Sequence, residues 1–276
     1  MALSMLTNVS SLGAQRNLAK TSNAVARNIS RLSSGMRINK SADDAAGLAI
    51  TSKMTAHIRG LGQAERNAND AVSLIQTAEG GLNEINGLLT RMRELAVQSS
   101  TGGTLVASDR SALNQEFEAL ESEIDRIVNV TKYNGQSLLN GALSGGVTFQ
   151  VGIVNTSNDR VSVNLSTALS SSLGIGTSSL TTATQAQLAI TAIDTAIDRV
   201  SSRRNTLGSA QNRLNVTISN LGSIKENLSA ANSRIRDVDV AAETADMSRN
   251  QILMQAGVSV LSQANQMPGM VLSLLG

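Results

Sequence analysis

The chain of 276 residues contains no cysteine or tryptophan, and it has only two phenylalanines, one tyrosine, one proline and one histidine. Without cysteine it can form neither disulfides nor thiolate metal sites. A core with so few aromatic side chains must be built from Leu, Ile, Val, Ala and Met, which suits ridged packing between helices better than a thick globular interior. The net charge of +2, with both signs interspersed, gives no basic patch that would favour nucleic acid.

Long apolar runs and charged chain ends are missing as well. No segment reaches the roughly eighteen uninterrupted apolar residues that a membrane span needs. Residues 1–15 carry no charged side chain, so they lack the positive region of a secretory signal peptide. Arg249 is the last charged residue, and residues 250–276 are uncharged. Two uncharged, apolar-rich ends are expected to be covered by other protein surfaces.

Residues 61–98 carry the strongest pattern in the chain. Their apolar residues are spaced by three and four without a break, as in a coiled coil, where one stripe of each helix faces a partner. Leu74, Leu88 and Leu95 widen this central stripe, so more than one partner helix is expected. Gly80 and Gly81 each cost about 1 kcal/mol against alanine, so packing must hold the helix. The central stripe consists of Leu61, Ala64, Ala68, Ala71, Ile75, Ala78, Leu82, Ile85, Leu89, Met92 and Ala96.

Helical periodicity also precedes the central stripe. The first helix is expected to end at Gly35. Ser41 and Asp44 then form an acidic variant of the capping box, which opens a second helix. Gly60 and Gly62 are expected to separate this second helix from the helix of the central stripe.

Three further helices are predicted beyond the central stripe, over residues 108–127, over residues 186–238 and around residues 254–261. The second of these is long and carries a matching stripe. Its spacing slips once near Leu221, where three residues stand for four, and such a stammer overwinds a coiled coil locally. Pro268 should kink or end the last helix.

One strand pattern lies between these helices. Val147, Phe149 and Val151 alternate with polar residues or glycine, and Val161 and Val163 do the same after a polar turn. This alternation predicts one β-hairpin with an apolar face.

Helices that run out and back place the two chain ends side by side and the hairpin far from both. The predicted fold class is therefore mainly α: an elongated antiparallel coiled-coil helical bundle with one small β-hairpin and paired N- and C-termini. We assign residues 1–40 and 236–276 to terminal helices and residues 41–235 to a coiled-coil core. Within the core, residues 146–185 form the hairpin and a loop rich in Ser, Thr and Gly.

The sequence shows no catalytic constellation. His57 stands alone, with no nucleophile motif from which a triad could be built. Asp43 and Asp44 are explained more simply as groups that cap a helix start and complement its dipole. Acidic residues 121–125 lie on a predicted helix with no His or Cys near them in sequence, which is not the pattern of a metal site. We therefore predict no enzyme activity, no cofactor and no metal.

Several motifs resemble those of bacterial flagellins. They are LSSGMRIN at 32–39, SADDAAGLAI at 41–50, RMRELAVQ at 91–98, the Tyr133-Asn134-Gly135 turn, and VLSLL at 271–275. The resemblance covers residues 1–140 and 186–276, and the long insertion that forms the outer variable domain of larger flagellins is missing. It implies a structural subunit of the flagellar filament, which is extracellular and polymerises into a helical tube for motility.

The resemblance also implies partners. The terminal helices are polymerisation helices that line the tube, and the core makes contacts between protofilaments. An export chaperone holds the C-terminal segment, the type III export apparatus secretes the unfolded subunit, and the filament cap covers the growing tip. No nucleic acid or membrane partner is implied. The residues expected to polymerise are Leu6, Val9, Leu12, Leu253, Val258, Leu261, Leu272, Leu274 and Leu275.

One further expectation carries over from the family. Arg91, Leu95 and Glu116 match positions that the animal Toll-like receptor for flagellin contacts. The simpler interpretation is that these side chains serve only subunit contacts or solvation.

Three other functions compete with the filament subunit. A hook–filament junction protein has similar terminal helices, but the intact stretch Arg37–Ile50 argues against it, and the number of copies per cell would decide. A cytoplasmic coiled-coil signalling module leaves the uncharged ends and the hairpin unexplained. An enzyme lacks any acid–base pair in a suitable context.

Overall fold

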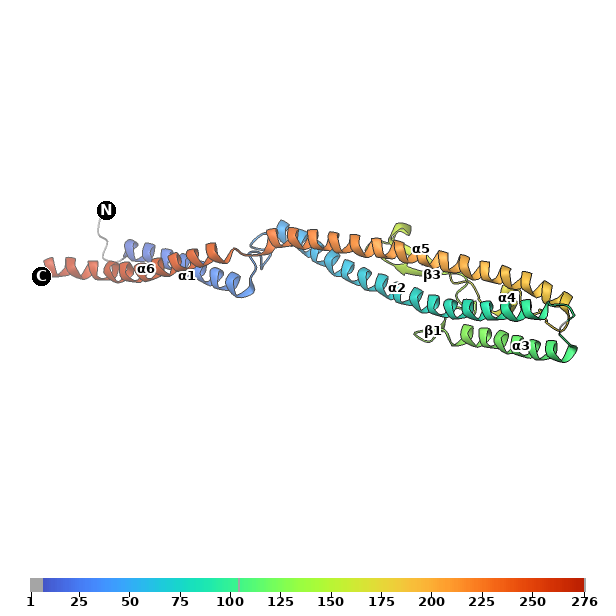
Figure 1. Cartoon of the computed structure of the whole chain (residues 1–276). Coiled ribbons are helices and arrows are strands. Elements are labelled where there is room, and N and C mark those ends of the chain that lie inside the picture. Colours follow the sequence, from blue (N-terminus) through green and yellow to red (C-terminus); the bar gives the residue numbers. More distant parts are fainter. Residues whose placement is uncertain (1–6, 104, 276) are drawn as a thin grey trace. The chain divides into compact units, whose positions relative to one another are not determined.

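The computed structural model describes residues 7–103 and 105–275 (Figure 1). Its contacts divide the chain into a terminal unit, residues 1–56 and 227–276, and a core unit, residues 57–226. Both divisions lie further from the chain ends than the boundaries predicted from the sequence. The two longest helices, α2 and α5, contribute residues to both units.

Six α-helices and two antiparallel strand pairs make up the described residues, which confirms the mainly α fold class. In chain order the elements are α1 (Val9–Ser34), α2 (Ala45–Ser99), α3 (Ala107–Val130), β1 (Lys132–Tyr133), β2 (Gln136–Ser137), β3 (Val147–Gln150), the 3-10 turn η1 (Ser157–Asp159), β4 (Arg160–Val163), α4 (Ser170–Leu173), α5 (Ala183–Arg236) and α6 (Val240–Leu275).

The core unit is built on the central stripe of α2. Every residue of the stripe is buried, and none is more than 3% exposed. Leu74 and Leu95, which widen the stripe, are 4% and 1% exposed. Apolar residues of α3, the hairpin and α5 pack into the same cluster, among them Phe117, Val163 and Ile193. The predicted stripe, with several partner elements around it, is therefore confirmed.

Helix α5 runs antiparallel to α2 within the core unit (Figure 1). Ion pairs at two levels of the contact establish the direction, because residue numbers rise along one helix as they fall along the other. Lys225 Nζ lies 2.8 Å from Glu65 Oε2, and Arg93 Nε lies 2.7 Å from Asp194 Oδ1. The antiparallel arrangement predicted from the sequence is confirmed here.

The stammer in α5 marks a change in burial. Leu214 is fully buried and Leu221 is 5% exposed, whereas Ile224, after the slip, is 40% exposed. Within the buried part, Arg204 of α5 forms an ion pair with Glu79 of α2, at 3.6 Å. The stripe of α5 thus supports the core only as far as its regular spacing lasts.

The start of α2 differs from the prediction in two ways. The helix is continuous through Gly60 and Gly62, so the predicted break is wrong. A Cβ on Gly60 would lie 3.0 Å from Cγ2 of Ile153, so this glycine lets the segment after β3 approach the helix closely. The cap also differs, because Asp44, not Ser41, accepts the backbone N–H three residues further on, at 2.8 Å.

Strands β3 and β4 form the predicted hairpin, with Phe149 opposite Val161. Val161 and Val163 are buried, as the alternation predicted. A second, shorter pair, β1 and β2, forms where only a turn was predicted. Its turn residues Asn134 and Gly135 have φ values of 47° and 81°, and positive values at both central positions are what a tight type I′ hairpin turn requires.

The segment predicted as a loop after β4 is packed rather than open. It contains the short helix α4, whose first residue, Ser170, donates its backbone N–H to Asp125 Oδ1 at 2.8 Å. Its apolar side chains follow neither a helical nor a strand period, so its composition showed only a polar loop. Those that are buried are Leu165, Ala168, Leu173, Ile175 and Leu180.

Two neighbouring glycines in α2 should respond oppositely to alanine. Nothing lies near a Cβ on Gly80, so Gly80→Ala should stabilise the chain by about 1 kcal/mol through helix propensity. A Cβ on Gly81 would lie 2.8 Å from Thr131 Oγ1 and 2.9 Å from Leu139 Cδ1, so Gly81→Ala should destabilise it by about 1–3 kcal/mol through overpacking. Urea unfolding of the two monomers measures this, and equal signs would contradict the described packing.

Candidate functional site

The terminal unit joins α1 and α6 side by side (Figure 1), but it buries little apolar surface of its own. Among the described residues of this unit, the buried apolar side chains are those of Val25, Ile38 and Ala264. This contrasts with the core unit, where the whole central stripe is buried. Apolar burial alone therefore does not fix how α1 pairs with α6.

Buried polar side chains fix that pairing. Asn28 Nδ2 donates to Glu243 Oε1 at 2.6 Å, and Asn250 Nδ2 donates to Asn28 Oδ1 at 3.1 Å. Arg31 Nη1 lies 3.8 Å from the other carboxylate oxygen of Glu243. Asn28 and Glu243 are 7% and 9% exposed, so a shift of one helical turn would leave a buried carboxylate without these partners. The network makes the antiparallel register specific.

A second polar contact explains why α6 continues past Pro268, where the sequence predicted a kink or an end. Proline has no backbone N–H, so it cannot donate to the carbonyl four residues earlier, which is that of Ala264. Asn8 Nδ2 donates to this carbonyl instead, at 2.7 Å, while Asn8 Oδ1 accepts from Ser11 N at 3.0 Å and caps α1. Ser11 Oγ adds a hydrogen bond of 2.6 Å to Asn265 Oδ1. The predicted end at Pro268 was wrong because α1 supplies the missing donor.

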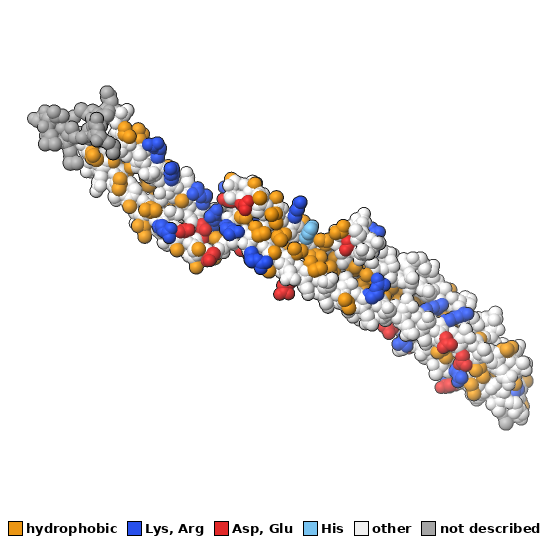
Figure 2. Space-filling model, turned by 90° about the horizontal axis from the view of Figure 1, so that it is seen from above, with side chains coloured by type: hydrophobic (Ala, Val, Ile, Leu, Met, Phe, Trp, Pro, Cys, Tyr) orange, Lys and Arg blue, Asp and Glu red, His pale blue; other side chains and the backbone are white. Residues whose placement is uncertain are grey.

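Apolar side chains on the terminal unit lie exposed (Figure 2). Of the predicted polymerisation residues, Val9, Leu12, Leu253 and Val258 are 65%, 51%, 51% and 54% exposed, and Leu261 is half-buried. Leu6 and the side chains of Leu272, Leu274 and Leu275 lie outside the described part of the structure. Sequence reasoning missed further exposed apolar residues, although their apolar character on predicted helices was a usable signal. They include Ile29, Ile50, Val240, Ile252, Val260 and Met267.

The LSSGMRIN motif forms the connection beside the end of α5. Gly35 ends α1, as predicted, and it has the left-handed conformation, with φ 70°. The next turn is held by backbone hydrogen bonds from Arg37 N to Arg236 O at 2.6 Å and from Val238 N to Gly35 O at 3.1 Å. Arg37 Nη2 also donates to Ile235 O at 2.6 Å, which satisfies a carbonyl at the C-terminal end of α5. The motif therefore has a structural explanation in the turn and cap it forms.

Asp43 of the following motif holds the second half of this connection. Its carboxylate accepts the backbone N–H groups of Lys40 and Asn39 at 3.0 and 3.2 Å. These two hydrogen bonds, with a smaller contribution from Arg31, lower the pKa of Asp43. The carboxylate therefore holds the backbone of the connection.

In the core unit, the structure brings together two of the three predicted receptor residues. Arg91 Nη2 lies 2.8 Å from Glu116 Oε1, and Arg91 Nη1 lies 2.9 Å from Glu94 Oε2. These hydrogen bonds, to Glu116 and then Glu94, raise the pKa of Arg91. Leu95 does not share this surface, because it is 1% exposed and belongs to the core cluster. In the described structure Leu95 therefore packs in the core, and its role as a receptor contact stays a prediction.

The described residues contain no group of three or more His, Cys, Asp or Glu side chains that could hold a metal ion. His57 is exposed on α2. None of the described helices combines the length and the apolar character that crossing a membrane requires.

Comparison with known proteins identifies the relatives of this arrangement. The bacterial flagellin N-terminal helical region matches residues 5–144, and the bacterial flagellin C-terminal helical region matches residues 190–275. The chain is 47% identical to a flagellin of Halalkalibacterium halodurans, over 97% of the chain and 98% of that protein. It is 41% identical to the flagellin of Bacillus subtilis, again over 97% of the chain and 98% of that protein. The chain belongs to the bacterial flagellin family.

Solved structures agree with membership of the flagellin family. The crystal structure of Bacillus cereus flagellin is 34% identical, with a TM-score of 0.51 over 60% of this chain and 94% of that one. A flagellar hook-associated protein of Vibrio parahaemolyticus reaches a TM-score of 0.59 over 71% of this chain and 100% of that one, but at 15% identity this likeness shows the fold alone. Sequence similarity therefore favours a filament subunit over a hook–filament junction protein.

Membership of the flagellin family settles the function that the motifs implied. The chain is a structural subunit of the flagellar filament, an extracellular structure in which copies of the chain polymerise.

The contact between Asn8 and Ala264 gives a testable coupling across the terminal unit. Asn8→Ala removes both the α1 cap and the donor to Ala264 O, so it should destabilise filaments by about 1–2 kcal/mol per subunit. In a Pro268→Ala background the cost should be smaller, because residue 268 then supplies the donor itself. Filament melting by calorimetry measures both costs, with the exposed Asn23→Ala as the control on α1. Equal costs in the two backgrounds would exclude the coupling.

Proposed function

We propose that the terminal unit is the part of this flagellin-family subunit that joins the filament, through the exposed apolar side chains of α1 and α6. One observation carries this proposal: four of the predicted polymerisation residues are more than half exposed, Val9, Leu12, Leu253 and Val258. Burying a large apolar side chain gains about 1.5–3 kcal/mol. Neighbouring subunits in a filament can supply the surfaces that bury them.

The small amount of apolar burial in the terminal unit supports a second step of the proposal, in which both chain ends become ordered only on polymerisation. Isolated helical stretches are marginal in water, and most helical stability in proteins comes from packing. In the terminal unit, the described apolar burial is limited to Val25, Ile38 and Ala264, which offers little to offset the entropy of ordering two helices. Contacts with other subunits would then couple folding to assembly.

The same reasoning supports the partners implied by the resemblance. A C-terminal helix with exposed Leu253 and Val258 needs cover before assembly, which is the role of an export chaperone. An end that orders late suits passage of the unfolded chain through the type III export apparatus and folding beneath the filament cap. A role as a structural element without catalysis completes the proposal.

Recognition by the animal Toll-like receptor for flagellin remains part of the proposal in a changed form. Arg91 and Glu116 are 51% and 45% exposed at their side chains, so a partner can reach both. Leu95 lies buried beside them and supports the helix that carries Arg91. The Arg91–Glu116 pair, with Leu95 as packing, is the surface we assign to receptor contact.

Limited proteolysis tests the assembly proposal. Soluble monomer should lose roughly residues 1–40 and 240–276 quickly and retain a helical core, because the ends lack partners until subunits meet. Filaments made from the same protein should resist cleavage at these ends. Mass spectrometry of the fragments locates the cuts. Ends of a verified monomer that resist cleavage as well as its core does would refute coupled folding.

A charge reversal tests the receptor surface. Arg91→Glu should reduce signalling by the soluble monomer in reporter cells at least tenfold, because a planar donor becomes a carboxylate beside Glu94 and Glu116. Arg93→Glu is the matched control, since it breaks a similarly exposed ion pair, with Asp194, on the same helix. Equal signalling by Arg91→Glu and the natural chain would remove the receptor assignment.

A further inference from the structure

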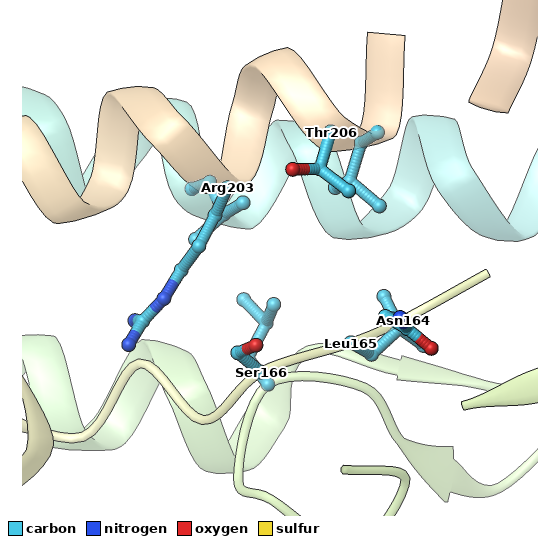
Figure 3. Close-up of a pocket in the computed structure, with 8 residues that line it drawn as sticks. Asn164, Leu165, Ser166, Arg203 and Thr206 are labelled. Carbon is cyan, nitrogen blue, oxygen red and sulfur yellow. The ribbon is translucent and has the colours of Figure 1, made fainter. Parts of the chain in front are cut away.

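A cavity of about 200 Å³ lies inside the core unit, between α5 and the segment that follows β4. Leu82 and Leu139 form an apolar part of its lining, and Asn164 and Ser166 contribute polar groups. Arg203 also lines this cavity, and its side chain extends from α5 toward the segment that carries Ser166 (Figure 3). None of the cavity's lining residues belongs to the Arg91 surface or to the terminal unit.

Arg203 has no partner among the described residues of the chain. Its Nη1 is shielded from solvent and has no hydrogen-bond acceptor, and no ion pair involves this side chain. Two neighbouring arginines of α5 are paired: Arg199 Nη1 donates to the carbonyls of Ser172 and Leu173, both at 2.9 Å, and Arg204 forms an ion pair with Glu79 of α2. Burial, and then the neighbouring Arg199, lower the pKa of Arg203.

A shielded guanidinium nitrogen without an acceptor is unfavourable, because desolvation is not offset by a hydrogen bond. The planar fork of arginine matches a carboxylate, which can accept two parallel hydrogen bonds. The surroundings add to this preference, since residues 199–225 of α5 contain five basic residues and no acidic one. Of these five, Arg204 and Lys225 are paired with Glu79 and Glu65 of α2, so the positive charge near the cavity comes from Arg203 and Arg199. A carboxylate is therefore the ligand whose shape and charge best match Arg203.

The filament brings copies of the chain together, and α2 carries suitable groups. Asp70 and Glu84 are exposed, and neither forms a hydrogen bond or ion pair among the described residues. They are fourteen residues apart, close to four helical turns, so they lie on one face of the helix. We propose that the Arg203 cavity binds a carboxylate of a second copy of this chain, presented by the Asp70 and Glu84 face of its α2.

Assembly measurements test how much this contact contributes to polymerisation. Arg203→Leu should raise the critical concentration for polymerisation about tenfold or more, because the neighbour's carboxylate loses its donor. The urea midpoint of the Arg203→Leu monomer should be unchanged or higher, since a half-buried charge without a partner has been removed. Arg213→Leu, an exposed arginine on the same helix, is the control and should change the critical concentration less than twofold. Polymerisation of Arg203→Leu at the natural concentration overturns the proposal.

Cross-linking tests the geometry of this contact. Because the natural chain has no cysteine, only the introduced cysteines can form disulfides. Subunits carrying Arg203→Cys are mixed with subunits carrying Asp70→Cys or Glu84→Cys, polymerised and oxidised. Disulfide-linked dimers that require both variants and appear in filaments, not in monomer, support the contact. Failure of Arg203→Cys to link to either position overturns it.

A last experiment distinguishes binding of a second copy of the chain from binding of a small anion. If inorganic phosphate raises the melting temperature of the natural monomer but not that of Arg203→Leu, the cavity serves a single chain and the second-copy proposal is overturned. No effect of phosphate supports a ligand that only assembly supplies. These outcomes are independent of the terminal unit, because protection of the chain ends in filaments is measured separately by proteolysis.

Discussion

The burial of the central stripe of α2 is the interaction on which the core unit depends. Its small and branched side chains let other elements approach α2 closely, and α3, the hairpin and α5 all contribute to the same cluster. The three-four spacing leaves the opposite side of the helix free for polar groups. Arg91 and Arg93 flank the stripe residue Met92, one paired with α3 and the other with α5, so the stripe also determines which surfaces are available for function.

The terminal unit uses polar and apolar groups in the reverse way. Buried hydrogen bonds among Asn28, Asn250 and Glu243 specify how its helices align, while many large apolar side chains remain exposed. A buried polar network contributes little net stability but penalises wrong registers strongly. This division of roles is what a polymerising segment requires. Its helices must present a defined surface, yet their apolar groups must remain available to other subunits.

The sequence predicted what depends on a local period and missed what depends on distant partners. The central stripe, the end of α1 at Gly35 and the hairpin follow from spacing or backbone preference, and the structure confirms them. The break at Gly60 was wrong because α2 continues through both glycines, and the end at Pro268 was wrong because a distant residue, Asn8, donates to the carbonyl that proline leaves without a donor. Leu95 shows a conflict within the sequence itself. Its position widened the stripe and so indicated burial, which the structure confirms, whereas its place in a motif implied a receptor contact.

The lack of a partner for Arg203 could not be predicted from the sequence, because an arginine on a helix is expected to be solvated when its surroundings are unknown. One principle connects three features of the chain. They are the lack of a partner for Arg203, the exposed apolar side chains of the terminal unit, and the buried central stripe of the core unit. A filament subunit needs one part whose interactions are satisfied within the chain, so that it folds before it meets its neighbours. It also needs groups that its own chain leaves unsatisfied, because a surface already satisfied in the monomer gains little from assembly. In this chain the first requirement falls to the apolar stripe, and we assign the second to exposed apolar side chains and to Arg203.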